Sequence, residues 1–355
     1  MARRKAGKKR PSVSRAVVIG ASAGGVETLK EVVSRLPTDF AAAVFVVLHI
    51  PPFTASFLPE ILTGCGRLPA GHPEDGAAIE MGRVYVAPPD HHLLIERGRI
   101  RVAKGPKENR FRPSIDALFR SAAYNFHTRA IGVVLSGALD DGSAGLWSIK
   151  RFGGVAIVQD PADARFASMP ESALQYVEAD HRLPAREIGA LLARLVEEPP
   201  PRARTIESKS RIRTAKEIEI AAEDGAFQKG IMDLGALTPF TCPECHGILV
   251  KLEDGKMSRF RCHTGHAYTD SALLEGVMES TGEMLWQVMR SLEEAVMVLD
   301  DMARHLKAAG SKKRARIFFA KARELEKRSK TFHSATLDHE SLSGDNLGQD
   351  DVPPS

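Results

Sequence analysis

The segment AVVIGASAGGVETLKEVV spans residues 16–33 and decides the fold class. Its first five residues are an apolar run rich in β-branched side chains, which is typical of a buried strand. Small residues follow, and a stretch with helical spacing of apolar side chains begins at about residue 26. A strand that turns directly into a helix is the repeating unit of α/β domains with a parallel sheet.

The same alternation continues up to about residue 195. Three further apolar strands are expected, AVFVVLH (43–49), AIGVVLSG (130–137) and GVAIVQD (154–160), and helices are expected at 26–34, 114–125, 142–152 and 184–195. Near-continuous apolar strands indicate a sheet that is covered on both faces. LLIE (93–96) and RIRV (99–102) predict a tight hairpin that decorates an edge of this core. Residues 16–196 are therefore predicted to form a mainly parallel, doubly wound α/β domain.

The remainder of the chain has a different character. Three prolines in VEEPPPRAR end the last helix, so a linker is expected over 197–238, with a short helix near 216–222. A small cysteine module, 239–270, precedes a helical hairpin predicted over 271–337. Apolar residues there recur with an average spacing of 3.5 residues, at 285, 289, 292, 296, 299, 303 and 306. A second helix, about 312–336, is expected to cover this stripe.

Composition and charge limit the function classes. Of 355 residues, 43% are hydrophobic and 26% charged, which is ordinary for a folded, soluble protein. The formal net charge is +4, but residues 1–15 hold seven Lys or Arg and no acid, so we expect a disordered basic tail there and no specific nucleic-acid binding. No apolar run approaches the roughly 18 residues of a membrane span, and a cytoplasmic protein is expected. Residues 338–355 are predicted to be an acidic, disordered tail.

Ser22 lies in a G-x-S-x-G turn, between the first strand and the first helix. Small neighbours allow a sharp elbow that exposes the serine hydroxyl, and the helix N-terminus offers free N–H groups to a developing oxyanion. A phosphate-binding glycine turn is the alternative. Glycines at 20, 24 and 25 do not match G-x-G-x-x-G, and no G-K-[ST] follows. From this motif alone, a nucleophile and a structural turn both remain open.

His49 and an aspartate pair follow two other predicted strands. His49 ends the second strand, and Asp140 and Asp141 follow the strand at 130–137, directly before a helix. Each could be structural, since a strand-end histidine often is and either aspartate could cap the helix. Parallel strands deliver their carboxyl ends to one edge, however, where α/β sheets place ligand sites. The order Ser, His, Asp differs from that of α/β-hydrolases.

Several motifs together resemble a known family. GASAGGVETL, LHIPPFTASF, RPSIDALFRSAA (112–123) and LSGALDDGSAGLWSIKRFGGVAIVQDPADARFASMPESAL (135–174) are similar to the catalytic domain of CheB, the chemotaxis protein-glutamate methylesterase. The resemblance covers about 16–195. It implies that Ser22 is the nucleophile, that His49 is the base, and that Asp141 orients His49. The backbone N–H groups of Ala23 and Ala138 are the oxyanion donors that it suggests.

The resemblance further implies a substrate and an alternative. The expected reaction is hydrolysis of glutamate γ-methyl esters on methylated chemoreceptor-like proteins, with release of methanol and with glutamine deamidation at the same positions. The alternatives are a catalytically weak binding or scaffold protein of a chemosensory pathway, and an esterase with another substrate. No cofactor is expected for catalysis.

Two departures from the family pattern bear on regulation and substrate. Chemotaxis methylesterases usually carry a receiver domain before the catalytic domain, whereas only 15 residues precede the first strand here, so regulation by a built-in receiver is not expected. The family's acidic loop usually reads G-M-G-x-D-G, whereas residues 137–142 read GALDDG. The substrate pocket is therefore expected to differ.

The cysteine module has the spacing of a zinc ribbon. Cys242 and Cys245 are separated by two residues, and Cys262 and His266 follow a predicted hairpin at 250–262. Two such turns can complete a tetrahedral, structural Zn²⁺ site. His246 and His263 are rival fourth ligands, and reduced, merely buried cysteines are the alternative. With the helical hairpin, this module is expected to serve as an arm that docks a signalling partner or another copy of the chain.

Overall fold

The structure is a computed structural model that describes residues 15–203, 205–223 and 225–340. Apart from Arg15, the predicted basic tail lies outside these residues, as does the predicted acidic tail from residue 341 onward. The chain divides into two compact units, Met1–Ala272 and Leu273–Ser355, which are described separately below.

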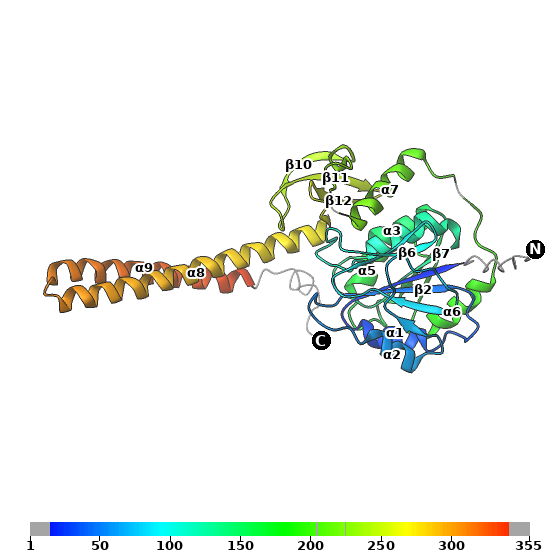
Figure 1. The fold of residues 1–355 in the computed structure, drawn as a ribbon, viewed down its shortest axis with the longest axis horizontal. Coiled ribbons are helices and arrows are strands. Elements are labelled where there is room, and N and C mark those ends of the chain that lie inside the picture. The colour runs from blue at the N-terminus through cyan, green and yellow to red at the C-terminus, as the bar shows by residue number, and fades with distance from the viewer. Residues whose placement is uncertain (1–14, 204, 224, 341–355) are drawn as a thin grey trace, which may run out of the picture. The chain divides into compact units, whose positions relative to one another are not determined.

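A seven-stranded sheet with the order β3-β4-β2-β1-β7-β8-β9 forms the centre of the first unit (Figure 1). Every neighbouring pair is parallel. The strands are β1 (Ala16–Ala21), β2 (Ala43–Leu48), β3 (Ala70–Gly71), β4 (Arg83–Val86), β7 (Ala130–Val134), β8 (Val155–Gln159) and β9 (His181–Leu183). Because β1 lies between β2 and β7, the three segments that follow these strands meet at one edge. The predicted α/β fold is confirmed.

Helices cover both faces of this sheet, as the apolar strands predicted. Val17 and Ile19 of β1 pack toward one group of helices, namely α1 (Gly25–Val33), α2 (Leu58–Cys65) and α6 (Ala185–Glu197). Ala16 and Val18 point the other way, toward α3 (Ile115–Phe126), α4 (Ser143–Arg151) and α5 (Ser168–Tyr176). Alternate side chains of one strand thus enter two separate cores, which is why the strand has no polar face.

The predicted hairpin exists, but its place differs from the expectation. β5 (His92–Glu96) and β6 (Arg99–Ala103) form a two-stranded sheet of their own and do not extend an edge of the main sheet. Leu93 and Ile95 are fully buried in the core beneath α3. Their burial explains the difference, because the apolar face of the hairpin packs on a helix and leaves no reason for edge pairing.

The linker and the cysteine module belong to the first unit. The linker contains α7 (Ser208–Ala222), which starts well before the predicted 216, and a short 3-10 helix, Ile231–Asp233. Strands β10 (Ala236–Thr241), β11 (Ile248–Asp254), β12 (Met257–Cys262) and β13 (Ala267–Thr269) form an antiparallel sheet in sequence order. β11 and β12 are the predicted hairpin, with Gly255 at φ +64° in its turn. The first half of α7, SKSRIRTAK, is too polar to show helical periodicity.

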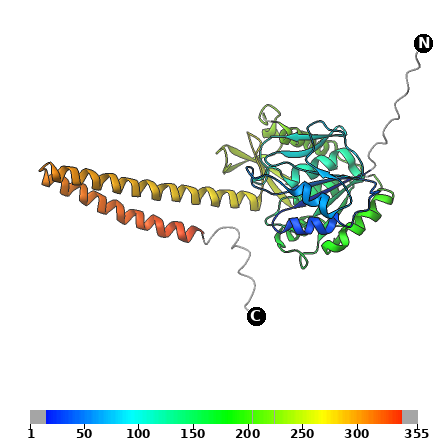
Figure 2. The same cartoon turned by 60° about the horizontal axis from the view of Figure 1, so that its bottom comes forward.

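The second unit is a helical hairpin, seen in Figure 2. α8 (Asp270–Ala308) begins at the end of the first unit and continues through the second, and α9 (Lys312–Glu340) returns after Gly310, whose φ is +81°. Met289 and Ala303 of the predicted stripe are buried. The predicted hairpin is confirmed. Among the described residues, no helix combines the length and the hydrophobicity that a membrane span needs.

Candidate active site

Ser22 lies at the elbow between β1 and α1. Its backbone N–H donates to the carbonyl of Ser136 (3.0 Å), and its own carbonyl accepts the N–H of Gly25 (2.9 Å). Gly24 has φ +70°, a left-handed conformation that favours glycine. A Cβ at Gly25 would come within 2.6 Å of the Cβ of Ala21. The glycines are thus required by the elbow itself, and the elbow leaves the serine half-buried at the sheet edge.

His49 follows β2 and points toward Ser22. Its Nδ1 lies 3.1 Å from Ser22 Oγ, and its Nε2 lies 2.8 Å from Asp141 Oδ2. The ring stacks on Phe111, with centroids 3.6 Å apart and planes inclined by 7°. The His49 side chain is only 4% exposed. Because Phe111 fixes the ring plane, both ring nitrogens stay aligned with their partners.

Asp141 is a buried acceptor at the N-terminus of α3. Besides His49, it accepts the N–H of Ile115 (2.7 Å) and of Asp116 (3.2 Å), and the hydroxyl of Ser114 (3.0 Å). Burial alone would raise the pKa of Asp141, but the hydrogen bond and charge of His49, together with hydrogen bonds from Asn109 and Ile115, hold it below its ordinary value. An ionised Asp141 favours the tautomer with a proton on His49 Nε2. Nδ1 is then free to take the Ser22 proton.

Asp140, the neighbour of Asp141, makes different contacts. Its Oδ1 accepts the hydroxyl of Thr269, 2.8 Å away in the cysteine module. Burial and the nearby Asp141 charge raise the pKa of Asp140 to about 6, although the Thr269 hydrogen bond opposes the rise. The spacing of the residues leaves both aspartates open as partners of His49, and the family resemblance implies Asp141. In the structure the partner is Asp141.

The two expected oxyanion donors lie beside Ser22. Ala23 is the next residue along the chain, and Ala138 directly follows Gly137, where an added Cβ would lie 2.9 Å from Ser22 Cβ. Within the described part of the chain, neither the N–H of Ala23 nor that of Ala138 donates a hydrogen bond to another protein group. Both are therefore available to a negative charge that develops on a bound carbonyl oxygen.

Asn109 was not singled out from the sequence. Its side-chain Nδ2 donates to Asp141 Oδ1 and to Asp116 Oδ2, each at 2.9 Å, and its Oδ1 accepts the N–H of Thr269 (3.0 Å). It stands shortly before the segment RPSIDALFRSAA, whose position in the family resemblance was the one available signal. The contacts of Phe111 and Ser114 with the site were likewise not predicted. Their roles depend on how the loop before α3 folds over the site.

The cysteine module gathers four ligand-type atoms. One such atom each from Cys242, Cys245, Cys262 and His266 lies within 4.8 Å of every other. The Sγ atoms of Cys245 and Cys262 are 3.6 Å apart, and His266 Nδ1 lies 3.5 Å from Cys262 Sγ. The group is compatible with a structural metal ion. Neither rival histidine, His246 or His263, belongs to this group in the described ranges.

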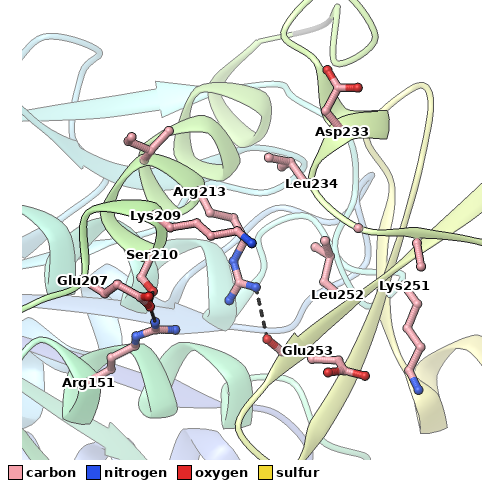
Figure 3. A pocket seen from close by; sticks show the side chains of 13 residues that line it. Arg151, Glu207, Lys209, Ser210, Arg213, Asp233, Leu234, Lys251, Leu252 and Glu253 are labelled. Atoms are coloured by element: carbon pink, nitrogen blue, oxygen red, sulfur yellow. Dashed lines mark hydrogen bonds and ion pairs between the residues drawn. The ribbon is translucent and has the colours of Figure 1, made fainter.

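A cavity of about 820 Å³ lies elsewhere in the first unit, among α4, α7, β10 and β11 (Figure 3). Both signs of charge line it, with Arg151 beside Glu207, and with Arg213 donating to the backbone carbonyl of Glu253 (3.1 Å). None of Ser22, His49 and Asp141 is among its lining residues. This cavity is therefore separate from the three residues at the sheet edge.

Comparison with known proteins identifies the family. A family model described as CheB methylesterase matches residues 17–192. A Leptospira interrogans protein, named as a candidate protein-glutamate methylesterase/protein-glutamine glutaminase, is 40% identical over 181 residues, which cover 51% of this chain and 94% of the relative. The chain belongs to the CheB methylesterase family.

Other CheB relatives match over a similar share of this chain. The protein-glutamate methylesterase/protein-glutamine glutaminase 3 of Burkholderia lata is 40% identical over 190 residues, which cover 52% of this chain and 52% of the relative. The crystal structure of the Thermotoga maritima CheB methylesterase catalytic domain is 34% identical, covers 51% of this chain and 98% of that one, and has a TM-score of 0.49. The chain thus spans about half the length of the Burkholderia relative that it matches.

Leu139 marks the departure from the CheB loop pattern. It stands where that pattern has its second glycine, and its φ is +61°, which an L-residue with a large side chain rarely adopts. The following residues still bring Asp141 to His49. The loop therefore keeps the backbone path that glycine would permit and holds a strained leucine beside the site.

Proposed function

We propose that this chain hydrolyses γ-methyl esters of glutamate side chains on chemoreceptor-like proteins, giving glutamate and methanol. The supporting observation is a chain of hydrogen bonds at one sheet edge of a CheB methylesterase domain. His49 Nδ1 lies 3.1 Å from Ser22 Oγ, and His49 Nε2 lies 2.8 Å from Asp141 Oδ2. The relatives named above are named as protein-glutamate methylesterases and protein-glutamine glutaminases.

The proposed reaction has two halves. Ser22 Oγ attacks the ester carbonyl carbon while His49 Nδ1 takes the hydroxyl proton, and Asp141 stabilises the resulting imidazolium. The Ala23 and Ala138 N–H groups stabilise the oxyanion. The C–O bond breaks, methanol leaves with the proton from His49, and a glutamyl ester of Ser22 remains. Water then attacks this ester with His49 as base, which restores Ser22. A glutamine side chain would give the same acyl-enzyme and release ammonia.

Exposed aromatic residues near the site support a protein substrate. Phe53 and Phe57, on the loop after His49, are 99% and 67% exposed. Phe166 is 42% exposed, and its ring would lie 3.2 Å from a Cβ at Gly24. Exposed aromatic side chains are enriched where a protein surface contacts another protein. The substrate helix of a receptor is the partner that we propose for them.

The test compares two substrates and three proteins. Wild type should release methanol from methylated receptor, and Ser22→Ala should lose this activity. Phe53→Ala should raise KM for methylated receptor by about tenfold, the effect of losing an interface contact worth about 1.4 kcal/mol, and should leave hydrolysis of a small model ester unchanged. Equal methanol release by wild type and Ser22→Ala would favour a binding or scaffold role. Activity on model esters without activity on receptor would indicate another ester substrate.

The cysteine group fits Zn²⁺ in a structural role. Three thiolates and one imidazole are a donor set that zinc prefers, and a site closed by four protein ligands leaves no position for substrate. A cytoplasmic location is part of this proposal, and the free state of Cys65, Cys242, Cys245 and Cys262 supports it. One zinc per chain, measured by elemental analysis of protein purified without added metal, is the expected result. A zinc content near zero contradicts it.

The helical hairpin supports self-association. Besides the stripe that faces α9, a second set of apolar side chains on α8 is exposed, including Met284, Val288, Val298 and Met302. α8 has an excess of acidic residues and α9 an excess of basic ones. Two hairpins could therefore pair α8 of one copy with α9 of the other into a four-helix bundle. Light scattering should give a dimer, and Met284→Glu with Val298→Glu should give a monomer. A monomeric wild type contradicts this arrangement.

A further inference from the structure

The loop that carries Asn109 belongs structurally to the cysteine module. The N–H of Asn109 donates to the carbonyl of Ala267 (2.7 Å), and the N–H of Ala267 donates to the carbonyl of Lys107 (3.2 Å). Glu108 and Ala267 form a parallel bridge. Residues 107–109 therefore extend the module's sheet beyond β13, and the path of this loop depends on where β13 lies.

Asn109 connects β13 to the triad acid. Its amide has one acceptor and two donor hydrogens, and the Thr269 N–H can only bond to the acceptor. With the oxygen held by β13, the NH₂ group must point the other way, toward Asp141 and Asp116. Asn109 is 3% exposed, so no water replaces these partners easily. The hydrogen bond from Thr269 of the module thus sets the orientation of the Asn109 amide, and this orientation directs an N–H of the amide to Asp141.

A buried cluster of charges fixes the module against the catalytic domain. Glu108 accepts hydrogen bonds from Arg120 of α3 (3.0 and 2.6 Å) and from Arg261 of β12 (2.6 Å). Glu217 of α7 accepts hydrogen bonds from Arg259 (2.8 and 3.0 Å) and Arg261 (3.0 Å). All five side chains are 5% exposed or less. The buried charges of the catalytic domain, of α7 and of the module therefore compensate one another only when all three are packed together.

The four-ligand group sits directly before β13. Cys262 ends β12, and His266 immediately precedes β13 at Ala267. The N–H of Cys262 donates to the carbonyl of His266 (3.0 Å). A metal ion bound by Cys262 and His266 would close this turn and fix where β13 begins. A bound metal would therefore also restrict the position of the Thr269 N–H, because Thr269 is the last residue of β13.

We propose that the cysteine module is a positioning element of the esterase site, in which metal-held β13 acts through Asn109 to hold Asp141 toward His49. This inference rests on the proposed function for its catalytic consequence. It makes Asn109 a positioning residue and makes the activity depend on metal at a site that takes no part in the chemistry. Loss of the metal then acts as an off switch that leaves Ser22, His49 and Asp141 in the chain.

The test uses the full chain and two readouts. The first is the rate at which a fluorophosphonate probe labels Ser22, with Ser22→Ala as the blank. The second is the NMR signal of the ring proton shared by His49 and Asp141, assigned by its loss in His49→Gln. Asn109→Ala and Asn109→Asp should slow labelling by about 10- to 100-fold, because misplacing a catalytic group by about 1 Å costs about that much. Both should shift or broaden the proton signal.

Asn125→Ala is the matched control. Asn125 also makes three hydrogen bonds through its amide, to the carbonyls of Ile95 and Ser121 and from the N–H of Arg97, but contacts no triad residue. Its variant should label at the wild-type rate and keep the proton signal. Equal loss in Asn125→Ala and Asn109→Ala would mean a general loss of structure and would overturn the inference.

Metal removal by a chelator completes the design. Metal removal should slow the labelling of wild type and of Asn125→Ala, and added Zn²⁺ should restore it. It should slow the labelling of Asn109→Ala little further, because two changes that act through the same contact are not additive. Equal slowing of wild type and Asn109→Ala would overturn the inference, and so would wild-type labelling that is insensitive to the chelator. Failure of wild type to label at Ser22 refutes the proposed function instead. The proton signal still decides in that case: if the chelator leaves it unchanged, the module does not position Asp141.

Discussion

Oδ2 of Asp141 lies 2.8 Å from Nε2 of His49, whereas the neighbouring Asp140 bonds to Thr269. The two adjacent carboxylates thus serve different partners. Asp141→Asn should lower kcat by about 10³- to 10⁴-fold, because the wrong histidine tautomer would face Ser22. Asp140→Asn should lower it by less than about tenfold. Steady-state kinetics on methylated receptor measures both, with thermal unfolding as a check on folding. Similar losses in the two variants would contradict the assignment.

Asp140 should make stability depend on pH. Its pKa of about 6 in the folded protein is above the ordinary value near 3.9. The folded state therefore binds this proton more tightly, so the stabilisation is complete below about pH 4 and is lost as pH rises through 6. Relative to Asp140→Asn, wild type should lose about 2 kcal/mol of unfolding free energy between pH 4 and pH 7. Urea unfolding at several pH values measures this difference. Parallel pH curves would show that Asp140 does not titrate as proposed.

The strained Leu139 predicts a stabilising substitution. A left-handed conformation costs an L-residue about 1–2 kcal/mol, and a glycine would avoid this cost. The greater flexibility of glycine in the unfolded state offsets about 0.5–1 kcal/mol of the gain. Leu139→Gly should therefore raise the unfolding free energy by about 0.5–1 kcal/mol. Leu139→Ala keeps the strain and is the control, which should show no gain. Urea unfolding of both variants decides, and an equal gain in both would assign the effect to the leucine side chain.

The fourth metal ligand can be identified by substitution. Since His266 lies in the four-atom group and the two rival histidines do not, His266→Ala should lose most of the bound zinc. His246→Ala and His263→Ala should retain about one zinc per chain. Elemental analysis together with thermal unfolding measures this, and loss of metal in either rival variant with retention in His266→Ala would reverse the assignment.

The sequence predicted the parts of the site that follow from strand ends. Ser22, His49 and Asp141 lie close together because β1, β2 and β7 are neighbours in a parallel sheet, and apolar strand patterns reveal such a sheet. The choice between Asp140 and Asp141 could not be made from spacing, because both flank the same helix start. It depends on α3, whose N-terminus binds Asp141.

The contact of the cysteine module with the site could not be predicted from the sequence, for a different reason. Asn109 and Thr269 are separated by a long stretch of chain, and their hydrogen bond depends on β13 pairing with a loop of the catalytic domain. Neither residue has a periodic pattern or a motif that indicates this pairing. Likewise, Glu108 and Arg261 look like ordinary surface charges in the sequence, and only the fold shows that they are buried together.

The most direct test of the account is to trap the acyl-enzyme. A peptide carrying a glutamate γ-methyl ester, mixed with the full chain and quenched rapidly, should leave the protein heavier by the peptide minus methanol. Digestion and mass spectrometry should place this group on Ser22, and Ser22→Ala should gain nothing. Methanol release at the same rate in Ser22→Ala as in wild type, or a covalent group on a residue other than Ser22, would contradict the central claim that Ser22 is the nucleophile.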